Sequence, residues 1–178
     1  MAATSVVPSR QIEDLLSLLD EMFFGPAWHG PSLRGALRRV TPAQAVWRAQ
    51  PGRHNIAELA LHAAYWKYAV RRRLTGGKRG SFALEGSNWF ARDAVTGASC
   101  RADLALLHDE HQRLCDAVRQ VEAARLLQRV PGGKWTVQQT IRGVAAHDAY
   151  HAGQIQLLKR LAPGGLKKGP RSSRGPWT

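Results

Sequence analysis

Hydrophobic residues recur three and four positions apart in four separate stretches of the chain, which is the spacing of amphipathic helices that bury one face. These stretches cover residues 9–23, 55–74 and 101–127, and a last one that runs from residue 136 to about residue 163. The remaining chain does not show the alternating pattern of a strand. We therefore predict an all-α protein of the four-helix-bundle class, with long connecting loops.

Residues at the helix starts support these assignments. Asn55 with Glu58, and Thr136 with Gln139, have the spacing of capping boxes, in which the side chain of each residue binds the backbone N–H group of the other. This capping role is sufficient to explain why a glutamate stands at position 58, without a role for Glu58 as a hydrogen-bond acceptor near His62. A short additional helix is expected after Pro31.

The third stretch carries one histidine among its apolar positions. This seam comprises Leu104, Leu107, His111, Leu114, Val118 and Val121. We interpret His111 as a core histidine whose ring nitrogens are hydrogen-bonded, since buried polar atoms normally have partners. A role at a metal site, as a fourth ligand or as the partner of a ligand, is the alternative.

Residues 76–99 show no clear periodicity and separate the second helix from the third. A loop of this length within a compact domain is usually functional or disordered. Trp89 and Phe90 lie in its middle, and such large apolar side chains indicate that the loop packs against the helices. We expect it to form a lid over one end of the bundle.

The length of 178 residues fits a single domain. We assign residues 1–163 to the bundle and residues 164–178, which are rich in Gly, Pro and basic residues, to a disordered tail. The longest apolar stretches fall well short of the ~20 residues that a membrane-spanning helix needs, and the N-terminus lacks the features of a signal peptide. Cys100 and Cys115 are the only cysteines and are expected to be buried thiols, so we expect a cytoplasmic protein.

The chain carries a net charge of +13, with its densest basic run at residues 71–73. A basic surface attracts nucleic acid or small anionic ligands, and it also increases solubility. The sequence contains no helix-turn-helix, zinc-finger or RNA-binding signature that would turn this charge into recognition. Nucleic-acid binding is therefore the less favoured interpretation of the charge.

Two histidines of the last predicted helix have the spacing of a metal site. His147 and His151 are four residues apart, so their imidazoles project from one face and can reach one ion at the ~2.0–2.1 Å of a metal–nitrogen bond. With seven histidines in the chain, such a pair also arises by chance in about one such chain in four. The competing interpretation is a buried, hydrogen-bonded histidine next to an exposed one. Asp148 projects about 100° away from His147 on an ideal helix and is not predicted as a ligand.

A third histidine strengthens the metal interpretation. His62 borders the apolar stripe of the second helix, so it would face the interior of the bundle with the other two. Burying neutral imidazoles in an apolar core is costly unless their nitrogens have partners, and one ion would satisfy all three together. Three nitrogen ligands also leave coordination positions open for water or substrate, as in catalytic sites.

The sequence around these histidines resembles the DinB/YfiT-like family of metalloenzymes. The stretch from His54 to Trp66, HNIAELALHAAYW, is similar to the second helix of that family. The stretch from Trp135 to Ile155, WTVQQTIRGVAAHDAYHAGQI, is similar to its last helix. Asn88-Trp89 falls in the middle loop of the family, and the similarity extends over about residues 11–161.

This resemblance implies a four-helix bundle, commonly a homodimer, with one divalent ion held by His62, His147 and His151. Zinc or nickel is the expected metal, and manganese and iron also suit three imidazoles. Characterised members include S-transferases that use a low-molecular-weight thiol such as bacillithiol, and mycothiol-dependent maleylpyruvate isomerases. The resemblance therefore implies a metal that activates a thiol, or a water molecule for hydrolysis.

Three other residues are weaker candidates for the pocket around the ion. His29 follows the first helix and is a candidate acid or base, although a histidine on a surface loop is the more frequent case. Tyr150 and Gln154 flank His151 on the last helix and are candidate pocket residues.

Two hypotheses for the function follow. The first is a metal-dependent enzyme, either a thiol S-transferase or a hydrolase, that acts on a small molecule. The second is a non-catalytic, metal-bearing bundle that binds nucleic acid or another macromolecule through its basic surface. Basic residues around the histidine pocket would favour the first, and a continuous basic stripe on one face would favour the second.

Overall fold

The computed structural model describes residues 9–164. It contains four long helices, α1 (Arg10–Phe23), α4 (Ile56–Thr75), α5 (Gly97–Arg119) and α6 (Val137–Leu161), and two short ones, α2 (Leu33–Leu37) and α3 (Pro42–Val46). A short 3-10 helix, Ala123–Arg125, follows α5. The described residues form no strand, so the predicted all-α fold is confirmed. The expected tail, residues 164–178, lies outside the described residues except for Gly164.

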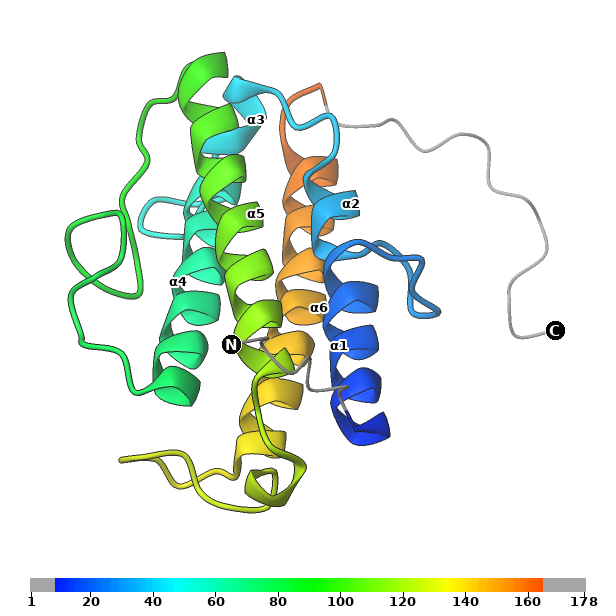
Figure 1. The fold of residues 1–178 in the computed structure, drawn as a ribbon. Helices are drawn as coiled ribbons and strands as arrows, with labels where there is room; N and C mark the ends of the chain where they lie inside the picture. The colour runs from blue at the N-terminus through cyan, green and yellow to red at the C-terminus, as the bar shows by residue number, and fades with distance from the viewer. Residues whose placement is uncertain (1–8, 165–178) are drawn as a thin grey trace, which may run out of the picture.

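The four long helices pack side by side (Figure 1). α4 contacts α5 and α6, and α1 contacts the same two helices, so each long helix has two long neighbours. α1 and α6 run in one direction along the bundle, and α4 and α5 run in the other. The short helix α2 packs on α6, and α3 packs on α4.

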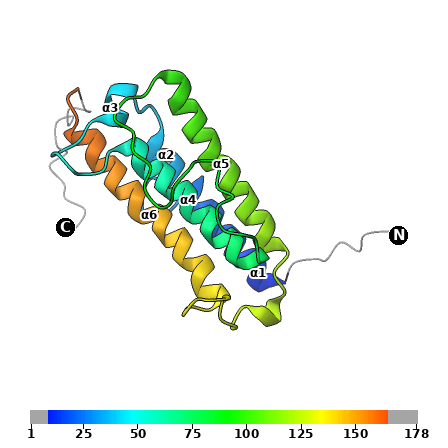
Figure 2. The ribbon, with the colours of Figure 1, turned by 90° about the vertical axis from the view of Figure 1, so that its left-hand side faces the viewer.

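The parallel arrangement of α4 and α5 requires a connection that returns along the length of the bundle. Residues 76–96 provide it, and Figure 2 shows this segment crossing in front of α4. Phe82 is buried against the rings of Tyr65 and Tyr68 of α4, and Phe90 is buried against Tyr65. The segment therefore lies along the side of α4, whereas a lid over one end was expected.

α5 is shorter at its C-terminal end than the sequence pattern predicts. It ends at Arg119, whereas the pattern continues to residue 127. The segment after α5 still contributes to the core, because Leu126 and Val130 are buried in the same apolar cluster as Leu114 and Val118 of α5. At the other end of the seam, Leu104 is 40% exposed, so its predicted place in the core is wrong.

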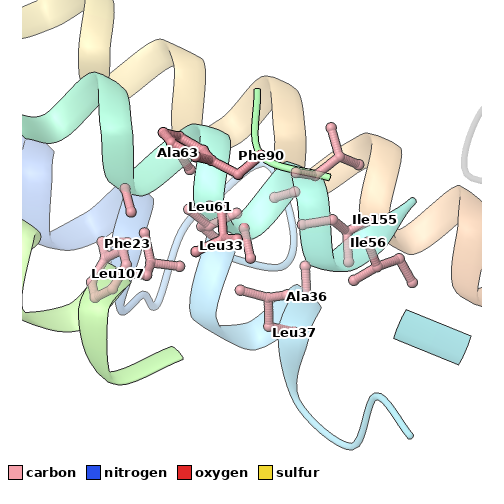
Figure 3. Packing of buried hydrophobic residues seen from close by; sticks show 14 of the residues in the cluster. Phe23, Leu33, Ala36, Leu37, Ile56, Leu61, Ala63, Phe90, Leu107 and Ile155 are labelled. Carbon is pink, nitrogen blue, oxygen red and sulfur yellow. The ribbon is translucent and has the colours of Figure 1, made fainter. Parts of the chain in front are cut away.

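Apolar side chains fill the space between the helices in two neighbouring clusters. Figure 3 shows the cluster nearer α2, which includes Phe23, Leu33, Ala36, Leu37, Ile56, Leu61, Ala63, Phe90, Leu107 and Ile155. Burial of such side chains contributes about 25 cal/mol per Å² of apolar surface and is the main force that holds the helices together. No helix within residues 9–164 combines the length and the apolar character that crossing a bilayer requires.

One ion pair lies inside this apolar interior. The Lys67 ammonium on α4 donates to the Asp148 carboxylate on α6, and both side chains are 0% exposed. Lys67 Nζ also lies 4.8 Å from the centroid of the Phe23 ring, a cation–π contact. Burial raises the pKa of the Asp148 carboxyl, and the neighbouring ammonium opposes that rise. Because both groups have lost their hydration, each depends on the other.

The substitution Asp148→Asn removes the anionic partner of Lys67 and keeps the shape of the side chain. We expect the free energy of unfolding to fall by about 3–5 kcal/mol, because the ammonium would remain buried without a counter-ion. Urea unfolding of the metal-free protein measures this change. Asp109→Asn, on an exposed position of α5, is the control and should change the free energy by under about 0.5 kcal/mol. Equal effects of the two substitutions would show that the buried pair contributes nothing to the free energy of unfolding.

Candidate metal centre

Three histidines from two helices converge between α4 and α6. His62 lies on α4, and His147 and His151 lie one turn apart on α6. Nε2 of His147 is 3.1 Å from Nε2 of His62 and 3.0 Å from Nε2 of His151. One ligand atom of each residue lies within 4.8 Å of the other two, so one ion can contact all three. The structure thus brings together the three residues that the sequence predicts as ligands.

The start of α4, two turns from His62, is held by a network of charged groups. The Glu58 carboxylate accepts hydrogen bonds from both arms of the Arg48 guanidinium, at 2.9 and 2.6 Å, and lies 3.0 Å from His54 Nδ1. Burial opposes ionisation of Glu58, but the hydrogen bonds from Arg48 and His54 outweigh it and hold the pKa of this carboxyl at about 2. Glu58 also completes the predicted capping box with Asn55.

Hydrogen bonds on the outer side of two rings decide which nitrogen carries the proton. His62 Nδ1 donates to the backbone carbonyl oxygen of Asn88 at 2.9 Å, and His151 Nδ1 donates to Oε1 of Gln154 at 2.6 Å. Both acceptors are oxygens that carry no proton, so each Nδ1 is the N–H group. The Nε2 atoms of His62 and His151 therefore both present a lone pair to His147.

These lone pairs fit a bound cation. With its proton on Nε2, His147 would satisfy only one of the two lone pairs that face it. With its proton on Nδ1, which is buried and has no partner, three lone pairs would face one another. A divalent ion accepts all three, and hydrogen bonds to the outer nitrogens are the usual way in which metal-binding imidazoles are oriented.

The rings are also in the protonation state that a metal requires. Burial lowers the pKa of His147 to about 3, and the neighbouring imidazoles His151 and His62 add to this effect. Burial likewise lowers the pKa of His151 to about 4 and shifts that of His62 in the same direction. All three imidazoles are therefore neutral near pH 7 and can donate their lone pairs.

The connection between α4 and α5 forms one wall of the site. Trp89 stacks on His62 with the ring centroids 3.8 Å apart and also stacks on His54 at 3.5 Å. The side-chain oxygen of Asn88 accepts a hydrogen bond from Trp66 Nε1 at 2.9 Å. Asn88 has a φ of 65°, a left-handed conformation that asparagine adopts more readily than most residues. The loop thus positions His62 through both Asn88 and Trp89.

Of the three weaker candidates, Gln154 and Tyr150 lie next to His151, whereas His29 lies elsewhere. Gln154 contacts His151 and donates through Nε2 to the exposed Tyr150 hydroxyl at 3.2 Å, so it is suited to holding a ligand in position. His29 is exposed between α1 and α2, with Nε2 3.2 Å from Met22 Sδ. It is not among the residues that converge on the three imidazoles.

An open cavity of about 670 Å³ lies beside His147. Its apolar walls include Trp66, Val70, Val130, Trp135 and Val144. Three basic residues, Arg73, Lys134 and Arg142, also line it, whereas no aspartate or glutamate does. The cavity thus combines apolar walls with positive charge next to one of the three histidines.

One family model covers the residues that form this site. The family model of the DinB superfamily matches residues 28–155, which is more than half of the chain. The chain belongs to the DinB superfamily. The matched range contains all three converging histidines and the loop that contacts them. Neither a search of curated proteins nor a search of solved structures found a match.

Two residues next to the centre of this DinB protein were not predicted from the sequence. Asp148 follows His147 directly, and its carboxylate binds Lys67 inside the bundle. Its spacing of four residues from Val144 and seven from Ile155 places it on the buried seam, a signal that could have identified it. Lys67 offered no such signal, because a lysine is almost never fully buried unless it has a partner.

The substitution Gln154→Leu removes the hydrogen-bond acceptor of His151 Nδ1. We expect the zinc affinity of this DinB protein to fall about 10–100-fold, the usual effect of losing such a partner. Competition with a chromophoric chelator measures the affinity. Gln156→Leu, two residues further along α6, is the control and should leave the affinity unchanged. If the two variants bind zinc equally well, Gln154 does not position the ligand.

Proposed function

We propose that this protein is a metal-dependent enzyme, a thiol S-transferase or a hydrolase, that acts on a small molecule with an apolar body and an acidic group. The observation that carries the proposal is the convergence of three neutral imidazoles beside an apolar cavity. A divalent ion held by His62, His147 and His151 would supply a Lewis acid that lowers the pKa of a bound thiol or water molecule. Zinc or nickel is the expected ion, and manganese and iron also suit this ligand set.

The side chains of the cavity support the choice of substrate. Lys134 Nζ lies 4.8 Å from the centroid of the Trp135 ring, and the Arg73 guanidinium carbon lies 6.0 Å from that of Trp66. An aromatic or aliphatic body would pack against the two tryptophans, while an acidic group would bind Lys134, Arg73 or Arg142. His147 would lie at the reacting end of such a molecule.

The positions of other arginines favour an enzyme over a protein that binds nucleic acid. Several arginines outside the cavity are engaged by carboxylates, in the pairs Arg48–Glu58, Arg71–Glu110, Arg92–Asp103 and Arg119–Asp116. The charge of these four arginines is compensated locally, whereas Arg73, Lys134 and Arg142 line the cavity beside His147. The homodimer and the cytoplasmic location stay predictions.

The double substitution His147→Ala, His151→Ala tests the metal centre. We expect it to bind one zinc or nickel ion fewer per chain than the wild type, because two of three ligands are lost. Elemental mass spectrometry after reconstitution and dialysis counts the ions, and circular dichroism checks that the helices persist. His29→Ala should bind as many ions as the wild type. Equal metal content in the double variant and the wild type would refute the site.

A substitution among the basic residues that line the cavity tests the substrate class. Metal-loaded protein should release the leaving group of an electrophilic aromatic substrate faster when that substrate also carries a free carboxylate than when this carboxylate is masked as a neutral methyl ester. A low-molecular-weight thiol would displace a ring halogen as a halide ion, and water would cleave an aryl acetate to acetate and a phenol. Arg142→Glu should lower kcat/KM for the acids about tenfold, which corresponds to about 1.4 kcal/mol, and should leave the methyl esters unaffected. Arg101→Glu, on the exposed start of α5, is the control. Equal rates for acids and methyl esters would refute the anionic substrate.

A further inference from the structure

A second group of side chains that can bind a metal lies between α1 and α5, on the opposite side of the bundle from the three histidines. It consists of Asp20 on α1 and of His111 and Cys115 on α5. Nε2 of His111 is 3.1 Å from Oδ1 of Asp20 and 3.6 Å from Sγ of Cys115. Sγ of Cys115 lies 4.0 Å from the same carboxylate oxygen.

These three distances are close to the distances between ligand atoms in a tetrahedral zinc site. Bonds of ~2.0–2.2 Å to nitrogen and oxygen and of ~2.3 Å to sulfur, at tetrahedral angles, place the ligand atoms about 3.4–3.6 Å apart. The nitrogen–sulfur distance agrees with this range, and the other two lie within a few tenths of an ångström of it. The fourth position would face solvent on the side of Asp20, whose side chain is 53% exposed.

Packing and burial set both the orientation and the charge of the His111 ring. Its ring is fully buried and stacks on Phe23 with the centroids 4.0 Å apart, so its orientation is set before any ion binds. Nδ1 has no hydrogen-bond partner, so the predicted core histidine is satisfied at only one ring nitrogen. Burial lowers the pKa of His111 to about 4, and Lys67 adds to this effect, so the imidazole is neutral.

A cysteine nucleophile is the alternative use of these residues, and their geometry does not favour it. In a catalytic triad the carboxylate binds the imidazole nitrogen opposite the one that faces the nucleophile. Here Asp20 and Cys115 both approach Nε2 of His111. Burial also raises the pKa of the Cys115 thiol to about 11, whereas nucleophilic cysteines have lowered pKa values.

We propose that Asp20, His111 and Cys115 form a second metal site, which takes zinc or a similar divalent cation. One carboxylate, one imidazole and one thiolate are a ligand set that suits such an ion. Binding releases the thiol proton of Cys115 to solvent. The ion would link α1 to α5, whereas the three histidines lie on α4 and α6.

Cobalt(II) tests this proposal, because a cobalt–thiolate bond gives a charge-transfer absorption in the near ultraviolet that imidazole ligands do not produce. The full chain with His147→Ala and His151→Ala should develop this band on titration with cobalt and saturate at one ion per chain. Adding Cys115→Ala should abolish the band. Cys100→Ser is the matched control, since neither cysteine forms a disulfide and Cys100 is only half-buried, and it should keep the band.

Asp20→Asn is a second variant at a half-exposed position that tolerates substitution. It should keep the band and weaken cobalt binding at least about tenfold, because the amide replaces an anionic ligand. Absence of the band in the protein that lacks the two histidines would overturn the proposal. So would a band that survives Cys115→Ala and disappears in Cys100→Ser. None of these readouts depends on activity at the three-histidine centre.

Discussion

The buried ion pair of Lys67 and Asp148 joins α4 to α6, and the geometry of the three-histidine centre depends on that junction. Asp148 is the neighbour of His147 in the chain, and Lys67 is five residues from His62 on α4. A slip of one helical turn between the two helices would move the imidazoles apart by about 5.4 Å. It would also leave two charges unpaired in an apolar interior, which makes such a slip unfavourable. The ion pair thus selects the one alignment in which the Nε2 atoms meet.

The direction of the helices has a second consequence for the site. Because α4 and α5 run parallel, the connection between them must travel back along the bundle, and it does so across α4. That path brings the carbonyl of Asn88 to His62 and the ring of Trp89 onto the same imidazole. A segment required by the topology therefore also supplies the groups that fix the tautomer and the orientation of a ligand.

The two groups of candidate metal ligands have the same arrangement on opposite sides of the bundle. Each takes two side chains four residues apart from one helix, His147 with His151 on α6 and His111 with Cys115 on α5, and a third from the helix beside it. The two groups differ in ligand chemistry, since one has three imidazoles and the other contains a thiol and a carboxylate. They also differ in surroundings, since a cavity of about 670 Å³ lies beside His147.

The sequence by itself determined the all-α class, the starts of α4 and α6 and the three converging histidines. These features depend on spacing along the chain, on capping residues and on which side chains share a helix face. Only the tertiary structure decided where α5 ends, how residues 76–96 cross α4, and that Lys67 and Asp148 pair inside the core. It also brought Asp20 to a histidine 91 positions away. Such features depend on contacts between residues that are distant in the chain, and the spacing of residues along the chain does not predict those contacts.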